Sequence, residues 1–236
     1  MKPAPFLLTA LFSAAVSAAP ATHMDTKAAT EAVSVYYRNP NPDRALKIMQ
    51  TIIADPLWKK DSARHNLSVW AAQILRQHPQ ATDKWCRAMK QYPAVTQDET
   101  AYFFFLANTS ESRKCLRNLN ISNHSKTYIA QNTPPDISSL SNISPADLDA
   151  LWTTFYATGN PKAVEKVLDR VLDYAKAQKA QEKSNHKNID MTGVAAAWSA
   201  RSNIMQNQDI RKIFDTYLNR LNATDKALLQ KILVQE

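Results

Sequence analysis

Few residue types in this chain could do chemistry, and the best-spaced pair is Asp61 with His65. Four residues apart on a predicted helix, a carboxylate and an imidazole share one face and could act as an acid–base pair or as two metal ligands. The same spacing is common on solvated helix faces, which is the alternative. Glu165 and Asp169 share it too, but neighbouring basic residues indicate an ion-pair surface there.

The small number of glycines and the scattered histidines exclude several well-known catalytic motifs. Gly159 and Gly193 are the only glycines, so the chain has neither a glycine-rich phosphate loop nor the glycine-flanked serine of α/β-hydrolases. The five histidines are scattered, and no HExxH sequence or repeated metal-ligand spacing occurs. We therefore predict no metal, no cofactor and no assignable catalytic residue.

The two cysteines, Cys86 and Cys115, are each other's only candidate partners for a disulfide. An exported chain reaches an oxidising compartment, where such a bond persists. The alternative is a pair of buried thiols. The bond would close a loop of about 30 residues and stabilise the fold by about 3–4 kcal/mol in the chain-entropy model.

Basic residues surround both cysteines at helical spacing, and each set of three covers about a third of one helix circumference. A Cys86–Cys115 bond would draw the two helices together and could place all six charges in one patch facing an anionic partner. The alternative is two ordinary solvated helix faces. The six residues are Lys84, Arg87, Lys90, Arg113, Lys114 and Arg117.

Trp198 lies in the stretch "AAAWSARS", where three alanines allow another helix to approach closely. Packing of the indole in the core is the first interpretation. The alternative is a ligand groove lined by Trp198 and Trp152, with Arg201 at its edge.

The elements that position these residues follow helical periodicity. In residues 144–158, Ser144 can cap a helix, Pro145 fits its first turn, and Gly159 permits the left-handed conformation that often ends one. Pro161 then opens the next helix, so Gly159 marks a tight corner between two helices.

A capping box from Thr96 to Glu99 is predicted before the run "AYFFFLA", which is apolar nearly all round and should lie at the centre of a helical layer. About ten helices are expected, and no alternating strand pattern occurs. The predicted fold class is all-α, with antiparallel helix pairs forming an irregular α-α superhelix or bundle. It is tetratricopeptide-like at most, because no steady repeat of about 34 residues is present.

Residues 119–143 are polar, contain two adjacent prolines and interrupt the helical pattern. We interpret them as a linker or long loop between an N-terminal helical part, 25–118, and a C-terminal helical part, 144–236. One continuous domain is the alternative.

Residues 1–18 have the composition of a signal peptide. Lys2 gives a positive start, an apolar run extends from Phe6 to Val16, and small residues predict cleavage after Ala18. The run is shorter than the roughly 20 apolar residues that span a bilayer, and no later stretch is long enough. We predict a periplasmic or secreted protein without a transmembrane segment in the mature chain. Export argues against nucleic acid as a partner, whereas the net charge of +8 suits an anionic envelope component.

A group of uncharacterised exported bacterial helical proteins is similar to this chain in two C-terminal stretches. These are "LWTTFYATGNPKAVEKVL" (Leu151–Leu168) and "GVAAAWSARSNIMQNQDIRKIF" (Gly193–Phe214). Those proteins carry an LW-x-x-F-x-ATG helix end and an AA-x-WS helix. The resemblance implies an exported helical fold and brings no known activity or active site.

These features predict an exported, non-enzymatic helical protein that binds another protein, as an adaptor, a chaperone-like factor or an immunity or inhibitor protein. Paired helices offer extended surfaces, and no catalytic constellation competes. The alternative is a cell-envelope enzyme or a glycan- or lipid-binding protein. Two convergent carboxylates in a groove would favour the enzyme, and a broad face without them favours protein binding.

Overall fold

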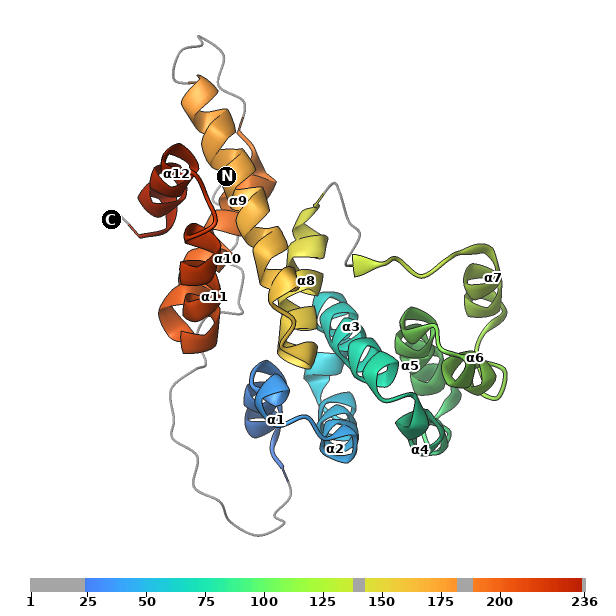
Figure 1. Cartoon of the computed structure of the whole chain (residues 1–236). Helices are drawn as coiled ribbons and strands as arrows, with labels where there is room; N and C mark the ends of the chain where they lie inside the picture. Colours follow the sequence, from blue (N-terminus) through green and yellow to red (C-terminus); the bar gives the residue numbers. More distant parts are fainter. Residues whose placement is uncertain (1–23, 138–142, 182–188, 235–236) are drawn as a thin grey trace. The chain divides into compact units, whose positions relative to one another are not determined.

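The computed structural model describes residues 24–137, 143–181 and 189–234 of the chain (Figure 1). Within these ranges it contains twelve α-helices, three 3-10 helices and no β-strand, so the predicted all-α class is confirmed. None of the helices in these ranges combines the length and the apolar content that a bilayer crossing needs. The predicted signal peptide, residues 1–18, lies outside the described residues.

The chain divides into two compact units that share one helix. Helix α8 (Pro145–Thr158) belongs to the C-terminal unit up to Trp152 and to the N-terminal unit from Thr153 onward. The described residues of the N-terminal unit are 24–137 and 153–159, and those of the C-terminal unit are 143–152, 160–181 and 189–234.

The N-terminal unit contains seven complete α-helices. They are α1 (Thr26–Ser34), α2 (Pro42–Ile53), α3 (Asp61–Gln77), α4 (Thr82–Met89), α5 (Ala94–Ala107), α6 (Ser110–Leu116) and α7 (Asn123–Gln131), with the 3-10 helices η1 (Tyr36–Arg38), η2 (Pro56–Lys59) and η3 (Pro79–Ala81). Helix α3 packs on α5, α1 packs on α2, and α4 packs on α6 (Figure 1). The segment predicted as a linker, 119–143, thus contributes a helix of its own, α7.

Aromatic side chains fill the core of the N-terminal unit. Trp58, Trp70 and Trp85 are fully buried, and Trp70 packs edge-on against Tyr36 with ring centroids 5.1 Å apart. Helix α5 buries its Phe103–Leu106 run and contacts α3, α4 and α6. Its nearly all-round apolar character therefore reflects a central position, as predicted.

Helix α5 begins earlier than the sequence predicts. Its first residue is Ala94, directly after Pro93, so Thr96 lies inside the helix and is buried. The predicted capping box is therefore wrong. Pro93 precedes the first helical residue, so Thr96 already belongs to the first turn and cannot cap it. A capping box occurs instead at α6, between Thr109 and Ser112.

Helix α9 is the central helix of the C-terminal unit, and α10, α11 and α12 all contact it (Figure 1). Arg220 pairs with Glu165 at 2.6 Å, and the Tyr217 hydroxyl donates to Asp169 at 2.5 Å. Glu165 is thus ion-paired, with a residue in the turn after α11, while Asp169 accepts a hydrogen bond from α11. The helices are α9 (Pro161–Gln181), α10 (Met191–Gln206), α11 (Gln208–Leu218) and α12 (Ala223–Leu233).

The predicted corner at Gly159 is present between α8 and α9. Gly159 has a φ of +68°, in the left-handed backbone region that residues with a Cβ rarely adopt. Its N–H donates to the Phe155 carbonyl at 2.7 Å, and the Asn160 side chain accepts from the Lys162 N–H at 3.1 Å. One helix is thus closed and the next is opened within a few residues.

Candidate functional site

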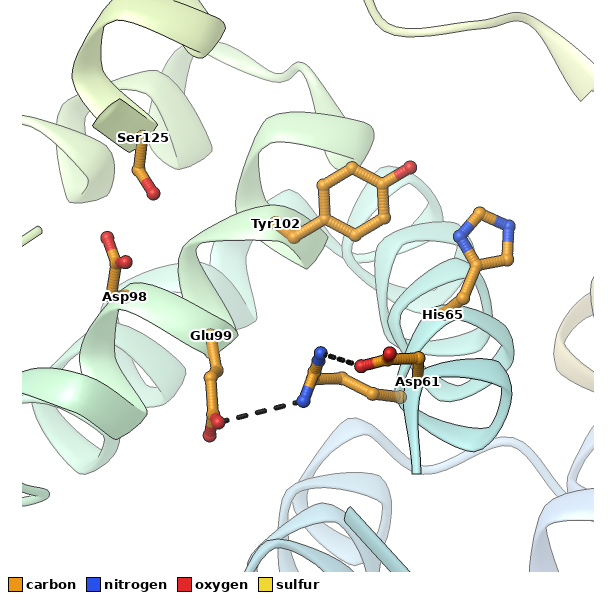
Figure 2. A pocket seen from close by; sticks show the side chains of 7 residues that line it. Asp61, His65, Asp98, Glu99, Tyr102 and Ser125 are labelled. Carbon is orange, nitrogen blue, oxygen red and sulfur yellow. Dashed lines mark hydrogen bonds and ion pairs between the residues drawn. The ribbon is translucent and has the colours of Figure 1, made fainter. Parts of the chain in front are cut away.

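An open pocket of about 380 Å³ in the N-terminal unit gathers acidic, basic and aromatic side chains from α3, α5 and α7 (Figure 2). The sequence analysis had considered only two of its residues, Asp61 and His65, as candidates for chemistry. The lining residues are Asp61, Arg64, His65, Asp98, Glu99, Tyr102 and Ser125.

Asp61 and His65 lie on the same helix, but each has a different partner. The Asp61 carboxylate pairs with the Arg64 guanidinium, and the His65 ring lies against Tyr102 with centroids 5.8 Å apart. Burial raises the pKa of the Tyr102 phenol above its ordinary value, so this hydroxyl stays protonated near neutral pH. The two side chains therefore do not form the acid–base pair that their spacing allows.

Glu99 is the most heavily engaged carboxylate of the pocket. Its Oε2 accepts the indole N–H of the buried Trp58 at 2.9 Å. Its Oε1 lies 3.6 Å from an Arg64 nitrogen and 3.7 Å from the Lys59 ammonium. This carboxylate, held by one donor and two cations, therefore joins η2, α3 and α5.

Asp98 also serves a structural contact, because its Oδ1 accepts the Ser122 N–H at the start of α7 at 2.8 Å. Figure 2 shows that Asp98 points toward Ser125 and that Glu99 points away from it, where it pairs with Arg64, so Asp98 and Glu99 do not converge. In residues 24–137, 143–181 and 189–234, no group of three or more histidine, cysteine, aspartate or glutamate side chains is arranged to hold a metal ion.

The predicted disulfide between Cys86 and Cys115 is present. The two sulfurs lie 2.08 Å apart and the two Cα atoms 5.7 Å apart. Both residues are buried, and the bond joins α4 to α6. Such a bond fits an extracellular or periplasmic location, where thiols are oxidised.

All six basic residues predicted around the disulfide are exposed on α4, α6 and their C-terminal ends. Two have partners: the Lys84 ammonium lies 2.9 Å from an Asp43 oxygen, and Arg113 donates to the carbonyl and the side chain of Asn108 at 2.9 Å. The other four have no acidic partner among the described residues, and they are Arg87, Lys90, Lys114 and Arg117. We call the six residues the basic surface, which consists of Lys84, Arg87, Lys90, Arg113, Lys114 and Arg117.

The two tryptophans proposed to line a groove differ in their burial. Trp152 is buried, with 6% of its surface exposed, and its indole N–H donates to the Ser199 hydroxyl at 3.1 Å. Trp198 is 52% exposed, so core packing of this indole was the wrong expectation. The small residues Ala196 and Ala200 occupy the buried face of α10 in its place.

Comparison with protein-family models, curated proteins and solved structures found no match for this chain. No relative's active site can therefore be mapped onto it. The sequence analysis did not identify Asp98 as a pocket residue and assigned Glu99 only to a helix cap, although these two are the only charged residues of α5. The signal that could have identified them is a pair of charged residues shortly before a run of three phenylalanines on the same helix.

Proposed function

We propose that this chain is an exported, non-enzymatic helical protein that binds an acidic face of another protein through the basic surface. The observation that carries the proposal is the set of four exposed cations without acidic partners among the described residues. They stand on two helices that a disulfide joins. Exposed charges on a fixed scaffold speed the encounter with an oppositely charged partner and set its orientation.

The occupancy of the pocket supports binding over the enzyme alternative. Asp61, Asp98 and Glu99 each accept a bond or an ion pair from within the chain. A glycoside-cleaving site needs two carboxylates that face each other across a substrate. Asp98 and Glu99 point apart (Figure 2), and the Arg64 guanidinium lies between Asp61 and Glu99 and pairs with both. Export is supported by the disulfide and by the leader-like composition of residues 1–18.

The proposal is tested by capturing partners from envelope extract on the immobilised chain without residues 1–18. The test variant is Arg87→Glu with Lys114→Glu. Its control is Lys47→Glu with Lys126→Glu, which changes the net charge equally at two exposed lysines outside the basic surface. We expect the test variant, and not the control, to lose a protein that wild type retains, with about tenfold weaker binding or more.

Salt and vesicles separate the remaining explanations. Raising ionic strength from 0.05 to about 0.5 M should release the partner, because the screening length falls to a few ångströms. Capture that is unchanged in the test variant would disprove a role for the basic surface. Co-sedimentation with phosphatidylglycerol vesicles that the test variant loses would instead assign the surface to anionic lipid.

A further inference from the structure

Helix α10 exposes large apolar side chains to an unusual degree. Of the nine exposed large apolar residues in the described part of the chain, four lie on this helix. Their exposed fractions are 63% for Met191, 40% for Val194, 52% for Trp198 and 68% for Met205. Single exposed apolar residues are ordinary, whereas a group on one element marks a binding surface.

These residues form one continuous line on the helix. Met191, Val194, Trp198, Arg201 and Met205 follow one another at intervals of three, four, three and four residues. That is the spacing of the seam in a coiled coil, which keeps side chains on the face that meets a partner helix. We call these five residues the α10 stripe.

The opposite face of α10 already completes the interior of the C-terminal unit. Gly193, Ala196, Ala200 and Ile204 are buried there, where α10 contacts α9, α11 and α12. The approach to α9 is close, since a Cβ on Gly193 would lie 2.5 Å from the Tyr174 ring. Three small residues and Ile204 thus face inward, whereas the large apolar side chains of the α10 stripe face outward and remain available to a partner.

Charge identifies the kind of partner. Arg201 is the only charged residue of α10, it lies within the stripe, and no ion pair involves it among the described residues. Covering the stripe would desolvate this guanidinium, which is costly unless a carboxylate meets it. A second copy of α10 offers no carboxylate, because the helix contains neither aspartate nor glutamate. Helices that lie on membranes carry many lysines and arginines, whereas α10 carries one cation.

We propose that the α10 stripe is a docking site for an amphipathic helix of a partner protein, which places an aspartate or glutamate opposite Arg201. Met191, Trp198 and Met205 supply the adaptable apolar contact, and Arg201 fixes the register and the charge of the partner. The site lies in the other unit from the basic surface and does not depend on it.

The probe is a synthetic amphipathic helix of about three heptads with leucine at its seam positions and one glutamate at the central one. A matched peptide carries lysine there. Binding is followed by fluorescence anisotropy of the labelled peptides. We expect wild type to bind the glutamate peptide about tenfold more tightly than the lysine peptide, and Arg201→Glu to reverse this preference.

Val194→Asp should weaken both peptides about tenfold or more, and its control, Val95→Asp, alters an exposed valine on α5 and should leave both unchanged. The reversal by Arg201→Glu decides the matter if Val194→Asp fails to fold. Arg87→Glu with Lys114→Glu should bind the peptides as wild type does, which separates this site from the basic surface.

Several results would overturn the proposal. These are equal affinities of the two peptides for wild type, no binding of either, or no change in Arg201→Glu. Concentration-dependent dimerisation that Val194→Asp abolishes would assign the stripe to a second copy of the chain. Vesicle binding that Val194→Asp abolishes would assign it to a lipid surface.

Discussion

Replacing Cys86 and Cys115 with alanine is expected to lower the free energy of unfolding of the N-terminal unit by about 3–4 kcal/mol. The bond spans 29 residues in the sequence, and the chain-entropy model gives about that value for a loop of this length at 25 °C. Alanine is the suitable replacement because both sites are buried, and a serine would bring an unpaired hydroxyl into each.

The two helices that the bond joins depend on it more than longer helices would. Helix α4 has eight residues and α6 has seven, and isolated helices shorter than about 12–15 residues are marginal in water. Without the bond we therefore expect α4 and α6 to open locally before the whole unit unfolds. Partner binding by the basic surface should weaken under the same conditions, even where the rest of the unit remains folded.

The assay is urea unfolding followed by fluorescence of Trp58, Trp70 and Trp85, which are buried in this unit. With a urea dependence of roughly 1–3 kcal/mol per molar, the midpoint should fall by about 1–4 M. A reductant should shift wild type to the midpoint of the double variant and leave the variant unchanged. Equal midpoints for oxidised wild type and the variant would refute the reasoning.

Substitutions at three further positions test individual contacts. Glu99→Ala should cost about 1–3 kcal/mol in urea unfolding, because it orphans the buried Trp58 N–H, whereas Glu99→Gln keeps an acceptor and should cost less. Gly193→Ala should lower the free energy of unfolding of the C-terminal unit by about 1–3 kcal/mol, because the new Cβ would overlap the Tyr174 ring on α9. Burial raises the pKa of Asp190, but bonds from Arg170 and from the Gly193 N–H lower it by more, so the net pKa lies below its ordinary value. A lowered carboxylate pKa contributes stability that is present above the unfolded pKa of about 4 and is lost as pH falls through the folded one. The melting temperature of wild type should therefore exceed that of Asp190→Asn above pH 4 and approach it at lower pH, and a constant difference would contradict this.

Local sequence was sufficient for the helices and for the covalent link. The corner at Gly159 could be predicted because a left-handed backbone conformation and a helix cap are decided by a few adjacent residues. The disulfide could be predicted because two cysteines leave a single pairing. The all-α class followed from apolar residues recurring at helical spacing along the chain.

Contacts between distant residues were beyond such reasoning. The sequence predicts Glu99 to be part of a helix cap. In the structure its carboxylate accepts a hydrogen bond from the indole N–H of Trp58, 41 residues away in the sequence. Helix α10 is apolar on both faces, so periodicity alone cannot tell which face is covered. The structure places Ala196 inside and Trp198 outside, because α9 approaches so closely that only small side chains fit between the two helices. Sequence by itself thus determined where helices form and which cysteines pair, while tertiary packing decided which of their faces remain open to a partner.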